Sequence, residues 1–341
     1  ALKFYDQALE ELQTSDDKNI TINIRIDRSN TLIVIGRIQE AISSLRKIIL
    51  AMSQDKNVDS GSWSRAAIIL ANAYYRSGQY QTSKILLKDI RSRIPLIPNE
   101  RQREIISLDS TNLEAMVQAK LGNFNTAIKI FEIGIDKSKK SHLLSSQEKQ
   151  SKIAQRLNNL GFWFREYGQL GKSIEYLERA LEIDKELNMP VAVAFDLRNL
   201  GISLTLQGDL DRAEAYLRES LSASLKSNLS YNAAYCEFGL GDIMLRRYKW
   251  QEAEGHFQNA LSISIKGHLL DFKWRALNGT AVAHLKRNDL LQAKKYFRQA
   301  IHVIEAQRPG LKRSPSNTGL QSDQGIEEVY ENLITLLMKE G

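Results

Sequence analysis

Apolar and polar positions alternate with helical spacing along most of this chain. Between Val191 and Leu225, one stretch carries apolar residues such as Phe195 at intervals of three or four, and a second has leucines on one face and charged residues on the other. Such spacing is typical of amphipathic helices. The two stretches are separated by Gly208-Asp209, where Gly suits a helix C-terminus and Asp suits the next N-cap. The segment is therefore predicted to form two antiparallel helices.

This helix pair recurs at a nearly constant period. Leu-Gly begins at Leu160, Leu200 and Leu240, which are 40 residues apart, and Thr280-Ala281 continues the series. A turn residue follows each time, and the same position recurs earlier in the chain at a slightly longer spacing. The turn residues are Gly36, Gly78, Gly122, Gly168, Gly208, Tyr248 and Asn288. Asn tolerates a left-handed backbone, whereas the turn at Tyr248 is expected to use another geometry. A fixed period of this kind predicts a stacked array.

The period also predicts how the chain is organised. Residues 1–305 are expected to hold the second half of one unit followed by seven helix pairs. Residues 306–323 are rich in Pro, Gly and Ser and are predicted to form a flexible loop. Residues 324–341 are predicted to form a further helix, the first half of a unit that leads into a missing C-terminal domain. Because the chain starts and stops inside units, we expect it to be a piece of a longer protein.

The recurring residues resemble the tetratricopeptide repeat, whose pattern is Leu-Gly, an aromatic or large residue, Gly, Ala, Phe or Tyr, and then Ala. The resemblance covers residues 1–305, with a further partial unit from Tyr330 to Gly341, and the unit length is similar to the longer-helix variety. The resemblance implies an all-α fold, an α-α superhelix of antiparallel helix pairs. It also implies that the first helices line a concave face, on which a protein or peptide partner binds.

The residues between the core positions of the first helices are the expected partner-binding residues. They are Arg65, Asn72, Tyr75, Asn158, Phe162, Arg165, Phe195, Arg198, Tyr235, Phe238, Asp242, Arg275 and Asn278. Aromatic residues beside Arg and Asn are typical of interface cores. For Phe195, Tyr235 and Phe238 the alternative is packing against adjacent units. Arg165, Arg198 and Arg275 are expected to project into the groove. The paired Lys and Asn of the family's clamps for a C-terminal carboxylate are absent, which argues against a chaperone-tail receptor.

Composition narrows the classes of partner. The net charge is +7, but most basic residues are interleaved with Asp and Glu, so direct nucleic-acid contact is disfavoured. Apolar runs are all shorter than the ~18 residues that a membrane span needs, and no membrane association is expected. The single cysteine, Cys236, excludes an internal disulfide, fits a cytoplasmic location and is predicted to be buried.

Patterns that indicate catalysis are missing. The five histidines lack metal-ligand spacing, and His284 is predicted to pack in the core. Gly239-Leu240-Gly241 lacks the third glycine, the preceding strand and the lysine of a phosphate-binding loop. We therefore expect no catalytic residue, no metal site and no cofactor in this chain.

The C-terminal residues carry a second resemblance. A last unit ending in VIE, a variable insertion and the helix IEEVYENLITLLMKEG together resemble the segment before the protease module of CHAT-domain proteins. This implies that the chain is the sensor or regulatory arm of a caspase-like cysteine protease whose dyad lies elsewhere. One branch of that family is joined to an RNA-guided CRISPR effector, which would make the partner a ribonucleoprotein. The alternative is a peptide-sensing regulator of transcription or signalling. Self-association through the uncapped ends is also expected unless further units cap them.

Overall fold

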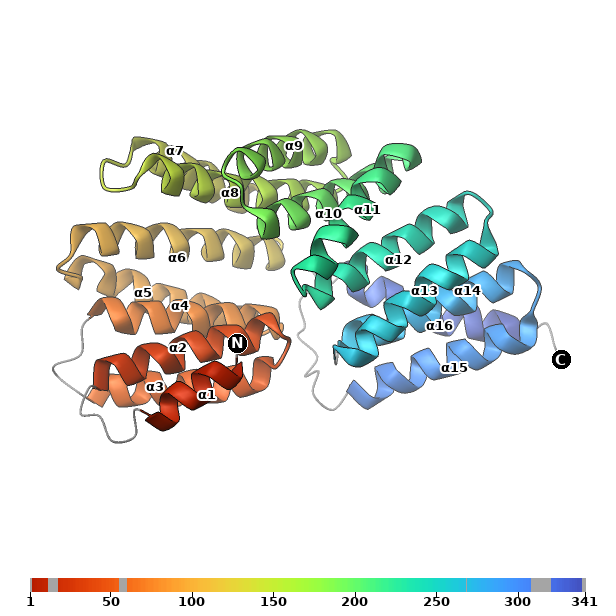
Figure 1. Ribbon diagram of the computed structural model, residues 1–341, viewed down its shortest axis with the longest axis horizontal. Coiled ribbons are helices and arrows are strands. Elements are labelled where there is room, and N and C mark those ends of the chain that lie inside the picture. The colour runs from red at the N-terminus through yellow and green to blue at the C-terminus, as the bar shows by residue number, and fades with distance from the viewer. Residues whose placement is uncertain (1, 12–17, 55–59, 268, 308–319, 339–341) are drawn as a thin grey trace. The chain divides into compact units, whose positions relative to one another are not determined.

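The computed structural model describes residues 2–11, 18–54, 60–267, 269–307 and 320–338, and every regular element in these ranges is helical. Figure 1 shows helices of similar length that follow one another in antiparallel order. The first helices of the pairs are α2 (Lys18–Val34), α4 (Ser60–Arg76), α6 (Glu100–Lys120), α8 (Ser146–Glu166), α10 (Pro190–Gln207), α12 (Ser230–Arg246) and α14 (Leu270–Lys286). The second helices are α3 (Ile38–Gln54), α5 (Tyr80–Arg93), α7 (Phe124–Lys140), α9 (Leu170–Glu186), α11 (Leu210–Lys226), α13 (Trp250–Lys266) and α15 (Leu290–Gln307).

Two further helices flank the pairs: α1 (Leu2–Glu11) and α16 (Leu320–Met338). A short 3₁₀ turn, Ile94–Leu96, follows α5. The prediction of an all-α fold built from consecutive helix pairs is confirmed, because α10 packs on α11, α12 on α13 and α14 on α15.

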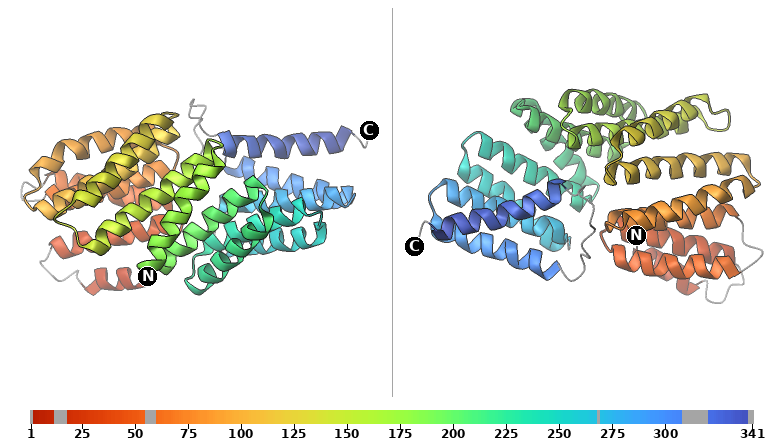
Figure 2. Two further views of the ribbon diagram at one scale, coloured as in Figure 1. Left: turned by 90° about the horizontal axis from the view of Figure 1, so that it is seen from above. Right: turned by 180° about the vertical axis from the view of Figure 1, so that it is seen from behind.

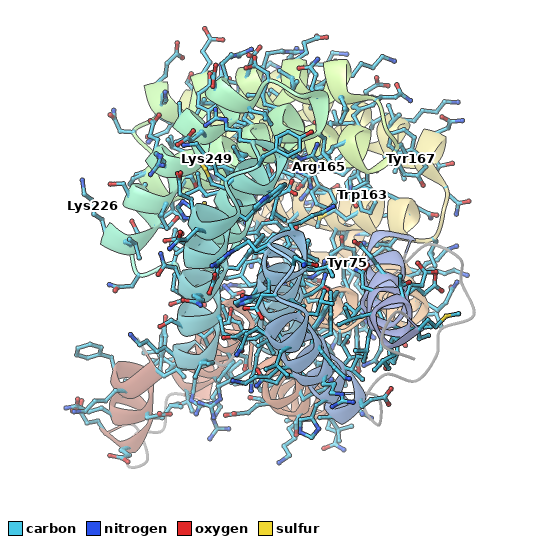
Figure 3. All side chains as sticks on the ribbon, turned by 90° about the vertical axis from the view of Figure 1, so that its right-hand side faces the viewer. Tyr75, Trp163, Arg165, Tyr167, Lys226 and Lys249 are labelled. Carbon is cyan, nitrogen blue, oxygen red and sulfur yellow. The ribbon has the colours of Figure 1, made fainter. Side chains whose placement is uncertain are left out.

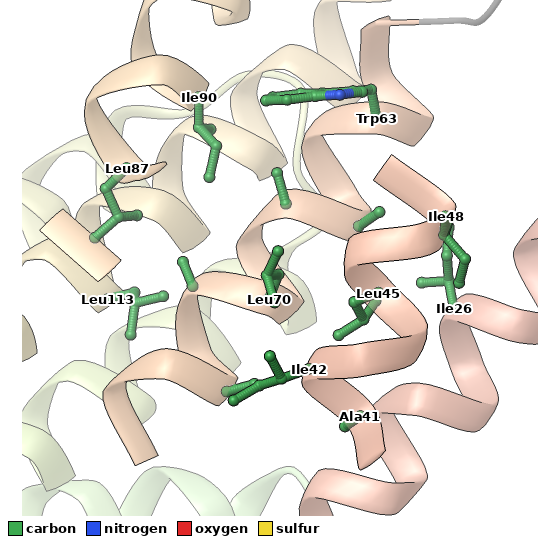
Figure 4. Close-up of a cluster of buried hydrophobic side chains, with 14 of the residues drawn as sticks. Ile26, Ala41, Ile42, Leu45, Ile48, Trp63, Leu70, Leu87, Ile90 and Leu113 are labelled. Atoms are coloured by element: carbon green, nitrogen blue, oxygen red, sulfur yellow. The ribbon is translucent and has the colours of Figure 1, made fainter. Parts of the chain in front are cut away.

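The chain divides into two compact units, Ala1–Arg156 and Leu157–Gly341. Unit 1 has a continuous apolar core to which α2 to α6 contribute. Figure 4 shows side chains of this core, among them Leu45 of α3, Leu70 of α4 and Leu113 of α6. Successive helix pairs therefore share one core, as expected when a single pair cannot cover both of its apolar faces.

Unit 1 also holds a charged group where an apolar side chain would be expected. Arg156 is 0% exposed, and its guanidinium donates to the backbone carbonyls of Leu108 at 2.6 Å and Lys152 at 2.7 Å. Gly134 of α7 leaves room for it, since a Cβ there would lie 2.4 Å from the arginine Nε. Burial lowers the pKa of Arg156 to about 10, so the group still carries its charge at neutral pH.

In unit 2, small residues set the distance between the helices of a pair. A Cβ on Gly201 would lie 2.6 Å from Cγ of Leu217, and one on Gly241 would lie 2.6 Å from Cε1 of Phe257. Ala213, the small residue facing Gly201, is fully buried. The recurrence of Gly and Ala in the sequence therefore reflects close approach of the first and second helices.

The turns between the helices of a pair share one backbone geometry. Gly168 and Gly208 have φ of 75° and 96°, and Asn288 has φ of 60°. Tyr248 has φ of 63°, so the expectation that its turn uses another geometry is wrong. The helix-pair geometry imposes the left-handed conformation at this position, although it is costly for a residue with a Cβ.

The last helix, α16, packs against α15 and the end of unit 2. Val329 and Leu336 are buried with Trp274 and Leu277 of α14, and Figure 2 shows α16 lying along this end of the unit. The helix begins at Leu320, earlier than residue 324, where the sequence placed it. Residues 308–319 of the predicted loop and residues 339–341 of the predicted helix lie outside the described residues.

Candidate binding face

The predicted partner-binding residues fall in both units. Arg65, Asn72 and Tyr75 lie on α4 of unit 1, and the other ten lie on α8, α10, α12 and α14 of unit 2. Arg65 forms an ion pair with Asp27 at 2.5 Å, Tyr75 contacts the ring of Tyr80 at 5.7 Å between centroids, and Asn72 is half-buried. In unit 1 these side chains therefore contact their own unit.

In unit 2, four polar residues connect three successive first helices. Asn199 of α10 donates to Asn158 of α8 at 3.1 Å, and Arg198 donates to Asn199 at 3.1 Å. Arg198 also donates to Asn232 of α12 at 2.7 Å. We call these residues, Asn158, Asn199, Arg198 and Asn232, the polar chain. It brings two of the predicted residues together and adds two that the sequence analysis did not name.

The polar chain is anchored to the second helix beneath it. The amide nitrogen of Asn232 donates to Ser220 at 2.9 Å and to Ser224 at 2.7 Å, and both serines lie on α11. Ser220 in turn donates to the backbone carbonyl of Ala194 at 2.6 Å. Asn232 and both serines are buried. Partners on two helices therefore hold the amide in one orientation.

Arg198 is stacked as well as hydrogen-bonded. Its guanidinium lies over the ring of Phe195 at 5.3 Å and over that of Tyr235 at 5.0 Å. The Nε atom is buried, and none of the described residues forms a hydrogen bond with it. Burial lowers the pKa of Arg198, and the positive charge of Arg165 adds to that effect. The predicted residues Phe195, Arg198 and Tyr235 therefore form one cluster.

Arg165 is placed differently from the expectation that it projects into a groove. It is 4% exposed and lies near the end of α8, with its guanidinium 4.8 Å from the ring of Phe162. Figure 3 labels Arg165 and Trp163 of α8, and Tyr167, the first residue after that helix. Its Nε and Nη2 donate to Glu166 at 3.3 and 3.2 Å, whereas Nη1 is buried without a partner. The guanidinium of Arg165 therefore lies against Phe162 and Glu166 of its own helix.

Two of the aromatic residues contact the neighbouring helices. The ring of Phe238 lies 5.4 Å from that of Phe257 on α13, and Tyr235 lies 4.9 Å from Phe272 on α14. Both rings are half-buried. Of the two alternatives for these residues, these contacts favour packing, although each ring keeps an accessible part.

The remaining predicted residues are spread over α12 and α14. Asp242 accepts from Arg246 on its own helix at 3.0 Å, and Arg275 lies over Trp274 at 4.6 Å. The Oδ1 atom of Asn278 is buried without a partner. We call the ten predicted residues of unit 2, with Asn199 and Asn232, the first-helix face of unit 2.

A pair of buried carboxyl groups lies beside the polar chain. Asp196 of α10 is 1% exposed, Asp184 of α9 is 5% exposed, and Asn158 donates to Asp196. Burial, together with the negative charge of Asp184, raises the pKa of Asp196 to about 8. The pKa of Asp184 is also raised by burial. At neutral pH Asp196 therefore retains a proton that an exposed carboxyl group would have lost.

The sequence analysis missed Asp184 and Asp196, although the period contains a signal for Asp196. Asp196 lies 40 residues before Cys236 and 40 after Arg156, so all three share one position of the repeat. Cys236 was predicted to be buried, and all three are at most 1% exposed. Transferring the burial of one copy to the others would have identified an aspartate and an arginine in the interior.

The two other predicted core residues lie where expected. Cys236 is fully buried, and burial raises the pKa of its thiol to about 11, so it is neutral. His284 is 7% exposed, stacks on Tyr296 at 5.4 Å between centroids and lies 3.1 Å from Asp289. Within the described ranges there is no cluster of three potential metal ligands, and no helix there is long and apolar enough to cross a membrane.

Comparison with known proteins agrees with this geometry. Residues 152–226, which span α8 to α11, match the tetratricopeptide repeat family. The fold is of the tetratricopeptide-repeat type. No curated protein sequence matches the chain.

Solved structures share the fold at low sequence identity. A Rap protein in complex with the Competence and Sporulation Factor is 14% identical with a TM-score of 0.58, and the match covers 93% of this chain and 98% of that one. BtubC (BKLC) from P. vanneervenii is 17% identical with a TM-score of 0.53, covering 72% of this chain and 94% of that one. The STAND protein PH0952 from Pyrococcus horikoshii, with a tetratricopeptide repeat sensor, is 12% identical with a TM-score of 0.63, covering 99% of this chain and 53% of that one.

Proposed function

We propose that the first-helix face of unit 2 binds an extended segment of a protein or peptide partner. The observation that carries the proposal is that polar side chains from successive first helices are held in place by one another, while some of their polar atoms lack a partner. Arg165, Arg198 and Asn278 each have such a buried atom. Because a buried polar atom without a hydrogen bond is costly, a ligand that supplies the missing partners would gain affinity.

The chemistry of the face suits an extended backbone. The amide of an Asn side chain can both donate to a carbonyl and accept from an N–H group. Asn158 and Asn199 are fixed by the polar chain, so little side-chain entropy would be lost on binding. Tyr235 and Phe195, half-buried beside Arg198, offer apolar area next to these polar groups. A combination of fixed polar groups and aromatic area is typical of the centre of an interface.

The structural neighbours agree with the fold that this proposal requires. One of the similar structures is a Rap protein complexed with the Competence and Sporulation Factor, and another contains a tetratricopeptide repeat sensor. At 14% and 12% identity these likenesses speak for the fold alone. The proposal therefore depends on the residues of this chain.

Selection from random peptides displayed on phage would test the proposal. We expect peptides that bind the purified chain and that lose affinity when Asn199→Leu interrupts the polar chain. Arg179→Gln is the control, since Arg179 is half exposed on the second helix α9, away from the first-helix face. Peptides that bind both variants as well as they bind the original chain would contradict the proposal, and so would a selection that enriches no peptide.

The C-terminal helix supports a more specific role. Its sequence resembles the segment before the protease module of CHAT-domain proteins, and α16 packs on α14 and α15 as the first helix of a further pair would. We propose on this ground that the chain is the regulatory arm of such a protease. The reading frame after Gly341 tests this directly: a caspase-like domain with a His and a Cys would support it, and its absence would refute it.

A further inference from the structure

Two arginines on neighbouring first helices have donors that no residue in the described part of the chain satisfies. Nη1 of Arg165 on α8 and Nε of Arg198 on α10 are both buried and lack hydrogen-bond partners. Asn199 of α10 donates to Asn158 of α8, so the two helices that carry these arginines are adjacent. The positive charge of Arg165 also contributes to lowering the pKa of Arg198.

The surroundings of Arg198 do not neutralise it. Its hydrogen-bond partners, Asn199 and Asn232, are neutral amides, and the rings of Phe195 and Tyr235 cover its faces. Asp196, two residues earlier on α10, accepts from Asn158, and its pKa of about 8 keeps it largely protonated at neutral pH. The positive charge of Arg198 is thus left without a negative partner.

Arg165 is neutralised on one edge of its guanidinium. Glu166 accepts from Nε and Nη2 and leaves Nη1 unsatisfied. Counted together, Arg165, Arg198 and Glu166 leave one uncompensated positive charge in a region that is shielded from water. A buried charge is expensive unless a counter-charge and hydrogen bonds accompany it.

We propose that Arg165 and Arg198 together bind the side-chain carboxylate of an Asp or Glu in the partner segment. A carboxylate supplies one negative charge and two acceptor oxygens, which can take hydrogen bonds from two guanidinium groups. The first-helix face continues past Arg198 onto α12 and α14, so a segment bound along it extends beyond this acid. The carboxylate therefore belongs to a side chain and not to the C-terminus of the segment.

This inference rests on the proposed function and specifies the chemistry of the partner. The test uses synthetic libraries of short peptides that are acetylated and amidated at their ends. Each library has one position fixed as Glu, Gln, Asp or Asn, and its binding to the chain is followed by fluorescence anisotropy. At one position we expect the Glu or Asp library to bind on the order of thirtyfold tighter than its amide counterpart.

Variants of the two arginines locate the effect. Arg165→Gln and Arg198→Gln should each remove most of the preference for the acid, whereas Arg179→Gln, the same charge change on α9, should leave it intact. Circular dichroism checks that each variant folds. Arg198→Gln removes two hydrogen bonds of the polar chain, so a lost acid preference in this variant could come from a disturbed face. Arg165→Gln avoids this problem, because the hydrogen bonds of Arg165 are made to Glu166 of its own helix.

The outcomes separate the two proposals. If the libraries bind without preferring an acid, or if the preference is unchanged in Arg165→Gln, the carboxylate site is refuted. The proposal that the face binds a peptide is not affected by that result. Acid preference that appears only in a parallel library with a free C-terminal carboxylate would overturn the side-chain assignment. Libraries that do not bind at all would overturn both proposals.

Discussion

Replacing Asp196 by Asn should remove a pH dependence from the stability of unit 2. The native state holds a proton on Asp196 up to a pH of about 8, because the carboxyl is buried beside Asp184, whereas the ordinary pKa is 3.8. Between these values the native state binds more protons than the unfolded state. Raising the pH through this window therefore lowers the free energy of unfolding. The amide introduced by Asp196→Asn would keep an acceptor for Asn158 and would never ionise.

The size of the effect follows from the width of the window. One pH unit between the two pKa values is worth at most about 1.4 kcal/mol of unfolding free energy. From pH 5.5 to 7.5 the original chain should therefore lose up to ~3 kcal/mol relative to the variant. At pH 5.5, where Asp196 is protonated in the native state and differs from Asn by a single group, we expect the smallest difference.

Urea unfolding followed by circular dichroism at pH 5.5, 6.5 and 7.5 measures this difference. The control is Glu182→Gln, which removes an exposed carboxyl from α9, the helix that carries Asp184. The unfolding free energies of the control and of the original chain should change by the same amount with pH. Asp196→Asn should become progressively more stable than either as the pH rises. If the difference in unfolding free energy between Asp196→Asn and the original chain is the same at all three pH values, the argument that Asp196 is buried and protonated is refuted.

Four glycine and turn positions give further tests by thermal unfolding. Gly201→Ala should destabilise by about 1–3 kcal/mol, because the new methyl would lie against Leu217, and an unchanged melting temperature would contradict the close helix approach. Gly255→Ala, on an exposed helix face with nothing within 4 Å, should instead stabilise by about 0.5–1 kcal/mol, and a lower melting temperature would show that this face is not open. Tyr248→Gly should stabilise by roughly 1 kcal/mol by relieving the positive φ of 63°, and a loss of stability would show that its ring contacts matter more. Gly134→Ala should destabilise by over about 1 kcal/mol, since the methyl would press on the buried arginine of unit 1; equal stability would show that this arginine can move.

The fold could be predicted because its determinants are repeated. Leu200, Gly201 and Ala213 recur with the same spacing in several units, so a substitution such as Tyr248 in one copy does not hide the pattern. The exact geometry at Tyr248 could not be predicted, since local preference favours negative φ and the helix-pair geometry overrides it. Tertiary packing decided that turn.

The candidate site was predictable only in part. The sequence analysis assigned Asn158 and Arg198 to the same face because their positions are equivalent in adjacent units, and in the structure both are hydrogen-bonded to Asn199. That assignment could not show that Arg165 folds onto Phe162, because long side chains choose among many rotamers. Asp196 was missed because its polarity suggests exposure, whereas its place in the repeat makes it buried.

The polar chain limits how this array could have changed length. An array held together only by Leu and Ala contacts could gain or lose a unit by duplication or deletion, since each junction would resemble the next. Removing residues 190–229 would bring Asn158 next to Asn232 without the Asn199 and Arg198 that now lie between them. Each unit in this region therefore depends on side chains of its particular neighbour.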